Sequence, residues 1–455
     1  MRDSAGLRRG KGRFRTCGAR RALSTFAGAH WRLAMAMVSP MAMALAVTLV
    51  GSATPAAAQS TTPVLHGALD GALGDARVRA ALRHVDTHRS AMAATLVALA
   101  RIESPSGHER QRAAEVARRM RAMGLLDVKL DTGANPNVTG RIRGRSPKAV
   151  MFVSTLDDLA NIPELQRRAP HPPRVEGDRV VGPGTNTSAT TAAMLAAAEA
   201  IVKSGVVPTH DLIFAAVAEE ESGLKGMKRL YSAYHERVAA VVDILGDGRS
   251  ITYGAIGIDW WRIVARGPGG HTLNGGLPNV NQGIARAVDG IFSIPLPPRG
   301  HPSRTVLNVA MLRSGEVFNH KPDSGWFSLD VRSLDAVTLA RTEDLARAVL
   351  ELVARETGIQ FEMREVQRTP GGQIEGMAQS PLVTTSAAIA RWLGLEPQLG
   401  DAGSANLNVA IAGGTPAIGL GGERGGRRGY PDEWADMTAM VRSAKHILLL
   451  AASLP

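Results

Sequence analysis

Three consecutive glutamates, Glu219, Glu220 and Glu221, are the residues of this sequence best suited to chemistry. They end an apolar run of strand length, and a turn from Gly223 to Gly226 leads from them into a predicted helix. Open α/β sheets keep their functional groups at the carboxyl ends of strands. Neighbouring side chains diverge there, so one glutamate can hold a metal while the next acts as a general base. The alternative is structural, because acids also stabilise a helix N-terminus.

Polar residues also follow other predicted strands. The strand at 149–153 leads to Thr155 and Asp157, and a strand at about 238–245 leads to Asp247. Polar groups gathered at strand ends, with strands that alternate with helices, predict an α/β fold with a mostly parallel sheet flanked by helices.

A glycine-rich turn at 182–184 precedes an alanine-rich helix. Such a turn can cradle a phosphate. No Gly-x-Gly-x-x-Gly and no Lys-Ser/Thr pattern accompanies it, so the sequence argues against a nucleotide site. Thr185, Asn186 or Thr187 is instead predicted to cap the helix.

The sequence pattern changes at Asp259, where a unit of different order begins. It comprises a strand at 259–266, a helix at 279–293, strands at 304–313 and 325–332, a helix at 337–357 and a strand at 359–367. This β-α-β-β-α-β order predicts a ferredoxin-like unit. The α/β pattern then resumes. Residues 59–258 and 369–455 are therefore predicted to form one domain, into which residues 259–368 are inserted.

The net charge of +12 comes mainly from the first 33 residues, which contribute +8. The rest of the chain is only slightly basic, so no nucleic-acid partner is predicted. An apolar run from Leu33 to Val50 and a small-residue segment ending at Ala58 follow the basic start. This succession is typical of a signal peptide over residues 1–58 and predicts export to the periplasm or outside the cell, with a retained anchor as the alternative. Cys17, the only cysteine, lies in the segment removed, so the mature chain has no disulfide.

An α/β domain with paired glutamates at a strand end and an inserted ferredoxin-like lid resembles the dinuclear-zinc exopeptidases and amidohydrolases. That family includes aminoacylase, glutamate carboxypeptidase, peptidase T and succinyl-diaminopimelate desuccinylase. The resemblance covers residues 85 to 450 and includes Ser104-Pro-Ser-Gly107 and Gly269-Gly-His271. It implies a zinc-exopeptidase fold, a lid that forms dimers, and peptides or N-acyl amino acids as ligands. It also implies two zinc ions that activate water, with a glutamate as general base.

The resemblance gives roles to four acidic residues. Asp157 corresponds to an aspartate that orients a metal ligand, and Glu220 corresponds to the general base. Glu221 and Asp247 correspond to metal ligands. A register one residue earlier would use Glu219 and Glu220, but the glycine spacing of the following turn favours the later register.

Three metal-ligand positions carry other residues. Thr155 stands at a histidine position, Thr187 at the position of the bridging aspartate, and Gly429 at the position of the last histidine. Each zinc would keep one carboxylate, whereas zinc sites usually have three or four protein ligands. Zinc is therefore not expected at full occupancy, and the Glu220 base would lack a metal-bound water. His171 could in principle re-form a site.

The predicted lid keeps the residues that the resemblance associates with substrate. His271 corresponds to a histidine that stabilises an oxyanion, often in the partner subunit's site. Asn319 and Arg332 correspond to residues that bind the substrate carboxylate, a role that suits the bidentate guanidinium of arginine. A loop histidine and a strand salt bridge are the structural alternatives for His271 and Arg332.

Three hypotheses for function follow. The first is an exported pseudoenzyme of this metallopeptidase family whose cleft binds a peptide or an N-acyl amino acid. The second is an active metal-dependent exopeptidase or amidohydrolase that uses zinc in an altered site. The third is a structural protein that forms a homodimer through the lid. In the absence of metal, packing like charges at Glu219, Glu220 and Glu221 predicts a raised pKa for at least one of them.

Overall fold

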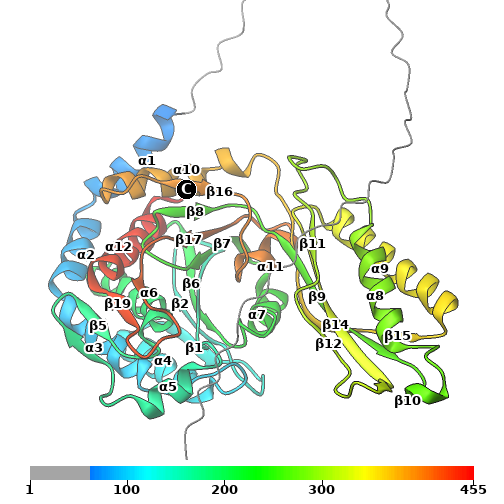
Figure 1. Ribbon diagram of the computed structural model, residues 1–455. Helices are drawn as coiled ribbons and strands as arrows, with labels where there is room; N and C mark the ends of the chain where they lie inside the picture. Colours follow the sequence, from blue (N-terminus) through cyan, green and yellow to red (C-terminus); the bar gives the residue numbers. More distant parts are fainter. Residues whose placement is uncertain (1–61) are drawn as a thin grey trace, which may run out of the picture. The chain divides into compact units, whose positions relative to one another are not determined.

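The computed structural model describes residues 62–455, and the predicted signal peptide lies outside them. An eight-stranded sheet with the strand order β1-β2-β6-β3-β7-β17-β8-β16 forms its centre (Figure 1). The predicted α/β fold class is confirmed. No helix among these residues is long and apolar enough to cross a membrane.

Four neighbouring strands at the centre of the sheet run parallel. They are β6 (His210–Val217), β3 (Ser146–Thr155), β7 (Val238–Ile244) and β17 (Ala417–Gly421). The flanking strands are β1 (Leu126–Leu130), β2 (Val138–Ile142), β8 (Ser250–Thr252) and β16 (Gln398–Gly400). β2 and β8 pair antiparallel with the central strands. The carboxyl ends of the parallel strands share one edge of the sheet, where ligand sites of open α/β sheets lie.

Helices cover both faces of this sheet (Figure 1). One face carries α2 (Ala76–Thr87), α3 (Arg89–Ala100), α4 (Arg110–Met123), α6 (Thr185–Ser204), α10 (Pro381–Trp392) and α12 (Met437–Ser453), and α1 (Thr62–Gly74) contacts α10 and α12. The other face carries α7 (Lys225–Tyr234) and α11 (Leu407–Ala412). Apolar side chains alternate between the faces because successive strand residues point to opposite sides: Phe152 and Phe214 face the first group, and Met151 and Ile213 face the second.

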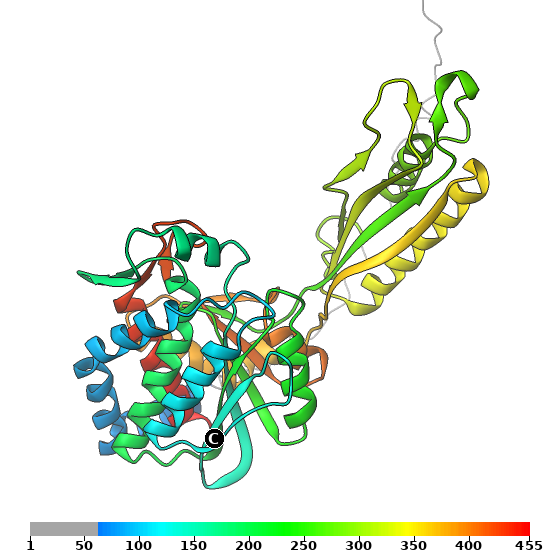
Figure 2. The same ribbon diagram turned by 90° about the horizontal axis from the view of Figure 1, so that it is seen from below.

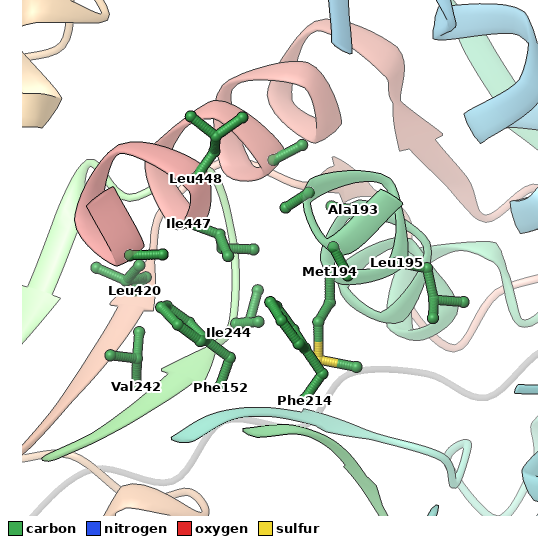
Figure 3. Close-up of a cluster of buried hydrophobic side chains, with 14 of the residues drawn as sticks. Phe152, Ala193, Met194, Leu195, Phe214, Val242, Ile244, Leu420, Ile447 and Leu448 are labelled. Atoms are coloured by element: carbon green, nitrogen blue, oxygen red, sulfur yellow. The ribbon is translucent and has the colours of Figure 1, made fainter. Parts of the chain in front are cut away.

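The larger hydrophobic core lies between the sheet and helices α6 and α12 (Figure 3). The rings of Phe152 and Phe214 stack with their centroids 5.5 Å apart. Met194 of α6, Leu420 of β17 and Ile447 of α12 pack in the same cluster. Full burial of each such side chain contributes roughly 1.5–3 kcal/mol to stability. Packing on this core fixes the strands whose ends form the site.

Residues 257–369 form a larger antiparallel sheet with two helices on one face and a separate two-stranded sheet, and Figure 2 shows α9 beside the larger sheet. The elements are β9 (Gly257–Arg266), β10 (Gly270–His271), α8 (Val280–Phe292), β11 (Val306–Asn308), β12 (Leu312–Ser314), β13 (His320–Lys321), β14 (Ser324–Ser333), α9 (Ala336–Thr357) and β15 (Gln360–Thr369). The order of the long strands is β11-β14-β9-β15, and all their pairings are antiparallel. Along β14, Phe327 and Leu329 are buried, whereas Trp326 and Asp330 are half-buried on the other face.

The strand predicted at 304–313 is interrupted in the structure, which has β11 and β12 in its place. The backbone N–H groups of Ala310 and Met311 both donate to Ser328 Oγ, at 3.1 Å and 2.9 Å. These bonds replace ladder bonds to β14, so pairing stops and then resumes at β12.

A small antiparallel sheet joins the glycine-rich loop after β17 to the segment that precedes α6. It consists of β18 (Gly425–Gly426), β19 (Trp434–Asp436), β5 (Arg179–Val181) and β4 (Arg174–Glu176). β19 pairs with β5, so the loop between β17 and β19 is fixed near the start of α6. A short helix, α5 (Ile162–Arg168), follows β3 and begins with a proline in its first turn.

Candidate functional site

The acidic turn lies at the carboxyl end of β6, and its three glutamates are placed differently. The backbone of Glu219 has a φ of 57°, and its carboxylate pairs with Arg229 at 3.1 Å and with Lys225 at 3.3 Å. Glu220 and Glu221 instead line a cleft of about 400 Å³. The structure therefore brings into the cleft the two glutamates that the sequence assigned as base and metal ligand.

Asp157 fixes the backbone of this turn. Its Oδ1 accepts the N–H of Glu220 at 3.1 Å, and its Oδ2 accepts the N–H of Glu221 at 3.0 Å and the hydroxyl of Ser106 at 2.6 Å. Burial raises the pKa of Asp157 to about 6, although these hydrogen bonds oppose the rise. Asp157 therefore orients the peptide groups of the acidic turn. Residue 155 is a threonine and offers no imidazole for it to orient.

The Glu220 carboxyl group is half-buried and lies near other acids. Burial raises the pKa of Glu220 to about 8, and the charges of Glu221, Asp157 and Asp243 add to the rise. The protonated form therefore predominates at neutral pH, where Glu220 can donate a hydrogen bond. The direction of this shift agrees with the raised pKa predicted for the glutamate run.

Two arginines from the loop after β17 line the same cleft as the two glutamates. The Arg428 Nη2 lies 2.5 Å from Glu221 Oε1, so a guanidinium neutralises a carboxylate that the resemblance assigns to zinc. Desolvation lowers the pKa of Arg424 to about 10, and the charge of Arg428 also lowers it, whereas the charges of Glu220 and Glu433 oppose this effect.

Two of the replaced ligand positions, Thr155 and Thr187, also line the cleft. Thr155 ends β3, and its Oγ1 accepts a hydrogen bond from Asn406 Nδ2 at 3.3 Å. Thr187 is buried in the first turn of α6, and Thr190 follows it along the same wall. These hydroxyl groups give the wall hydrogen-bonding capacity without an imidazole or a bridging carboxylate.

The third replaced position, Gly429, is not among the residues that line the cleft. Its φ of 81° lies in the left-handed region, where a larger residue is strained. A Cβ atom at Gly429 would approach Leu159 Cδ1 to 3.3 Å. A histidine here would therefore strain the backbone of this loop.

The prediction that Thr185, Asn186 or Thr187 caps α6 is wrong. The N-cap is Gly184, whose φ of 87° is left-handed, and no side chain of the cap residue bonds the helix. The carboxylate of the buried Glu433 provides the cap: its Oε1 accepts the N–H of Asn186 at 2.8 Å. Its Oε2 accepts the N–H of Gly429 at 2.8 Å. Sequence reasoning missed this cap because Glu433 is far from α6 in the chain.

Asp247, assigned by resemblance as a metal ligand, does not line the cleft. Its side chain is buried, and its Oδ1 accepts the N–H groups of Arg249 and Glu423, each at 3.1 Å. Asp247 therefore connects the turn after β7 to the loop that carries Arg424.

Asp243 is a carboxylate of β7 whose charge influences the protonation of Glu220. Its charge raises the pKa of Glu220, and burial raises the pKa of Asp243 itself to about 6. The Asp243 Oδ2 accepts the N–H of Leu407 at 3.1 Å, and its Oδ1 lies 3.4 Å from Asn406 Nδ2. Asp243 therefore joins the sheet to α11 beside the cleft.

A fully buried ion pair supports the segment that carries Asp157. Arg112 Nη2 lies 2.6 Å from Asp158 Oδ2, and the two side chains are 1% and 0% exposed. The same guanidinium donates to the backbone oxygens of Leu156 and Ile102, at 2.8 Å and 2.5 Å. Unpaired charges are costly in such a place, so these bonds stabilise the backbone around Asp157.

The structure brings together two of the three lid residues assigned to substrate. His271 Nε2 lies 3.1 Å from Asn319 Nδ2, and His271 Nδ1 accepts the N–H of Leu273. Arg332 is placed separately on β14, where it pairs with Asp330 at 2.9 Å. None of the three lines the cleft that holds Glu220.

The residues of the cleft do not fit a dinuclear zinc centre. Within residues 62–455, no group of three or more His, Cys, Asp or Glu side chains is arranged to hold a metal ion. Thr155 and Thr187 are poor zinc ligands, Gly429 has no side chain, and Glu221 is paired to a guanidinium. His171 is exposed on a loop and does not line the cleft.

A central, largely parallel sheet with an acidic turn at a strand end and an inserted antiparallel sheet defines the zinc-exopeptidase class of fold. Residues 156–453 match the peptidase family M20/M25/M40, and the chain belongs to this family. The resemblance read from the sequence is thereby confirmed. A comparison with curated proteins finds no match.

Solved structures share this fold. A tripeptidase from Staphylococcus aureus subsp. aureus Mu50 has a TM-score of 0.68 and 20% identity, over 80% of this chain and 99% of that chain. The aminopeptidase PepT from Bacillus cereus ATCC 10987 has a TM-score of 0.67 and 17% identity, over 80% and 98%. The Bacillus subtilis YXEP protein, described as a dinuclear metal binding peptidase, has a TM-score of 0.60 and 16% identity, over 81% and 98%. At these identities the likeness shows the fold alone.

Sequence reasoning missed Arg424, Arg428 and Asp243 as residues of the site. The arginines had a detectable signal, since the glycine-rich loop is strongly basic while the run at 219–221 is acidic, and opposite charges favour proximity. Asp243 had no such signal, because it lies inside an apolar strand and only the register of β7 against β3 reveals its place.

Proposed function

We propose that this protein is an exported, catalytically degenerate member of its peptidase family whose cleft binds a peptide or an N-acyl amino acid. The observation that carries the proposal is the ion pair between Arg428 and Glu221. A guanidinium at this distance neutralises the carboxylate and repels a metal cation from the same position. The substitutions at Thr155 and Thr187 remove further ligands.

The chemistry of hydrolysis supports the same proposal. Cleavage of an amide by this family's route needs a metal-bound water and a base that accepts its proton. With a pKa of about 8, Glu220 is mostly protonated at neutral pH, and in that form it cannot accept a proton from water. Binding requires neither a metal-bound water nor a base. A cleft of about 400 Å³ is large enough for a small molecule, and its hydroxyl and guanidinium groups can form hydrogen bonds with one.

The proposal includes export and dimerisation. Export is supported by the basic, apolar and small-residue segments of residues 1–58. A homodimer through the unit formed by residues 257–369 is supported by the half-buried face of β14, which the helices α8 and α9 leave uncovered.

Active metal-dependent hydrolysis is the rival hypothesis, because the chain belongs to a peptidase family and keeps Glu220 and Glu221 in the cleft. Assays with dipeptides and N-acyl amino acids in the presence of added zinc separate the two. We expect no turnover above that of Glu220→Gln, together with measurable binding of at least one ligand by calorimetry. Turnover that Glu220→Gln abolishes would support the rival. Absence of both turnover and binding would support a structural role.

A further inference from the structure

We propose that Arg424 binds the carboxylate group of a small ligand, in the part of the cleft that the resemblance assigns to zinc. The inference rests on the proposed function, because it names the chemical group that the same cleft recognises. It assigns to Arg424 a role that the resemblance gave to Arg332.

Arg424 is the arginine of the cleft that has no ion-pair partner among residues 62–455. The residue is half-buried and lines the cleft, and it makes no side-chain hydrogen bond within these residues, although the charges of Glu220, Glu433 and Glu221 act on it. The other guanidinium, that of Arg428, is already paired with Glu221. A half-buried guanidinium without an ion-pair partner can still form a charge-assisted pair, which an anionic ligand would supply.

The backbone on both sides of Arg424 is fixed. The N–H of Glu423 donates to Asp247 Oδ1 at 3.1 Å, and the Arg424 oxygen accepts the N–H of Asp436 at 3.0 Å. Gly425 then pairs with Ala435 in the small sheet. The backbone that carries the Arg424 side chain therefore needs no rearrangement when a ligand binds.

The rest of the cleft suits a planar monoanion. A guanidinium binds a carboxylate through two parallel hydrogen bonds. Hydroxyl groups of Thr155, Thr187 and Ser404 line the same cleft and can donate to carboxylate oxygens. Because Arg428 is paired with Glu221, Arg424 offers a single unpaired charge, which a carboxylate monoanion balances and a phosphate dianion exceeds.

Arg332 is less available than Arg424 to bind a ligand carboxylate, because it is already paired. It lies on β14 with its Nη2 at 2.9 Å and its Nε at 3.0 Å from the carboxylate of Asp330. A ligand at Arg332 would have to compete with this neighbour, whereas a ligand at Arg424 displaces no ion pair. We therefore expect recognition of a carboxylate to depend on Arg424 more than on Arg332.

Calorimetric titration of the purified protein with N-acetyl amino acids and with their primary amides tests the assignment. The wild type is expected to bind the acids at least about tenfold more tightly than the amides, because the amides lose the charge-assisted pair. Arg424→Gln is expected to remove this preference. Arg424→Lys is expected to keep part of it, since lysine keeps the charge without the bidentate geometry. Inorganic phosphate is expected to compete only weakly.

Arg427→Gln is the matched control. Arg427 belongs to the same loop but pairs with Asp432 and does not line the cleft. Its variant is expected to bind as the wild type does, and Arg332→Ala is expected to keep the preference for acids. Thermal unfolding of each variant establishes that it is folded.

The outcomes separate this inference from the proposed function. A preference for acids that survives Arg424→Gln, or one that only Arg332→Ala removes, overturns the role of Arg424 and leaves the proposed binding function standing. Equal binding of acids and amides, or tighter binding of phosphate, overturns the carboxylate assignment alone. Zinc-dependent hydrolysis of the acids overturns the proposed function, and the effect of Arg424→Gln on KM then decides the inference. No binding of any ligand overturns both.

Discussion

The acidic turn after β6 and the glycine-rich loop after β17 contribute opposite charges to one cleft. The acidic turn keeps the paired glutamates of the family together with their support, since Asp157 accepts the backbone N–H groups of Glu220 and Glu221. The glycine-rich loop keeps its support in Glu433 but presents Arg428 to Glu221. The two regions thus share an intact backbone framework and differ in whether their side chains suit a metal.

This difference separates two kinds of residue. Supports such as Asp157 and Glu433 satisfy buried backbone groups and stabilise the chain whatever the cleft binds. Residues that face the cleft determine what it binds, and Glu220 among them also makes stability depend on pH. In this protein the Arg428 guanidinium balances the charge of Glu221, at the position where the resemblance implies a zinc ion. We therefore expect substitutions of supports to change stability and substitutions of cleft residues to change binding.

The largest expected effect concerns the deepest support. Arg112→Leu leaves Asp158 as an unpaired buried charge and is expected to lower the free energy of unfolding by about 3–5 kcal/mol. Denaturant-induced unfolding measures the change. Arg167→Leu is the control, because Arg167 forms an exposed pair with Glu103, and its effect is expected to stay within about 0.5 kcal/mol. Similar values for the two variants would contradict the distinction between supports and surface.

A second comparison sets a support of the acidic turn against a glutamate of the same turn. Asp157→Ala leaves the partly buried N–H groups of Glu220 and Glu221 without their acceptor and is expected to cost about 2 kcal/mol. Glu221→Ala breaks only a partly exposed ion pair and is expected to cost less than about 1 kcal/mol. Urea unfolding of both variants checks the order, and a larger loss for Glu221→Ala would reverse our interpretation.

The pH dependence of stability tests how much the ionisation of Glu220 in the acidic turn destabilises the folded protein. The pKa of Glu220 is about 8 in the folded protein against an ordinary value of 4.5. The folded state therefore binds this proton more tightly than the unfolded chain does, so the stability contributed by protonated Glu220 is lost as pH rises from about 4.5 to about 8. Glu220→Gln removes the loss and is expected to be more stable than the wild type at pH 9 by up to about 5 kcal/mol, because one pKa unit corresponds to about 1.4 kcal/mol.

Thermal unfolding from pH 5 to pH 9 measures this difference. Glu219→Gln is the control, because Glu219 pairs with Arg229 and Lys225. Its variant is expected to gain no stability at any pH in this range. A wild type whose stability relative to Glu220→Gln does not change with pH would show that Glu220 is ionised throughout.

The smallest expected effect concerns the glycine-rich loop. Gly429→Ala places a Cβ atom on a residue with a φ of 81° and is expected to cost about 1 kcal/mol. Gly276→Ala, where a Cβ atom would meet nothing within 4 Å, is expected to change stability much less. Calorimetric melting of both variants tests whether the backbone at position 429 is fixed as described. Equal melting temperatures would indicate a loop that adapts to a side chain.

Much of the fold could be predicted from the sequence because its strands and helices are strongly periodic. The inserted unit follows the predicted element order, since β14 alternates apolar and polar residues and α9 ends at Gly358 in a left-handed conformation. The prediction of a single strand at 304–313 is wrong. Two of its backbone N–H groups donate to the Ser328 hydroxyl and not to the backbone of β14.

The site was less predictable, because the residues that interact in it are far apart in the sequence. The acidic turn could be located at a strand end from local sequence. The bond between Arg428 and Glu221 joins residues 207 positions apart and leaves no local pattern. Asp247 sits in a plausible position for a metal ligand, yet the backbone N–H groups of Arg249 and Glu423 occupy its Oδ1. These hydrogen bonds depend on the tertiary structure, so the sequence alone does not reveal them.

Zinc stoichiometry tests the central claim most directly. The protein would be dialysed against excess zinc, passed through a desalting column and analysed for metal and protein content. We predict well below one zinc per chain, because Arg428 holds Glu221 and residues 155, 187 and 429 provide no ligands. One or two zinc ions per chain that a chelator removes, and that Glu221→Ala abolishes, would contradict the account.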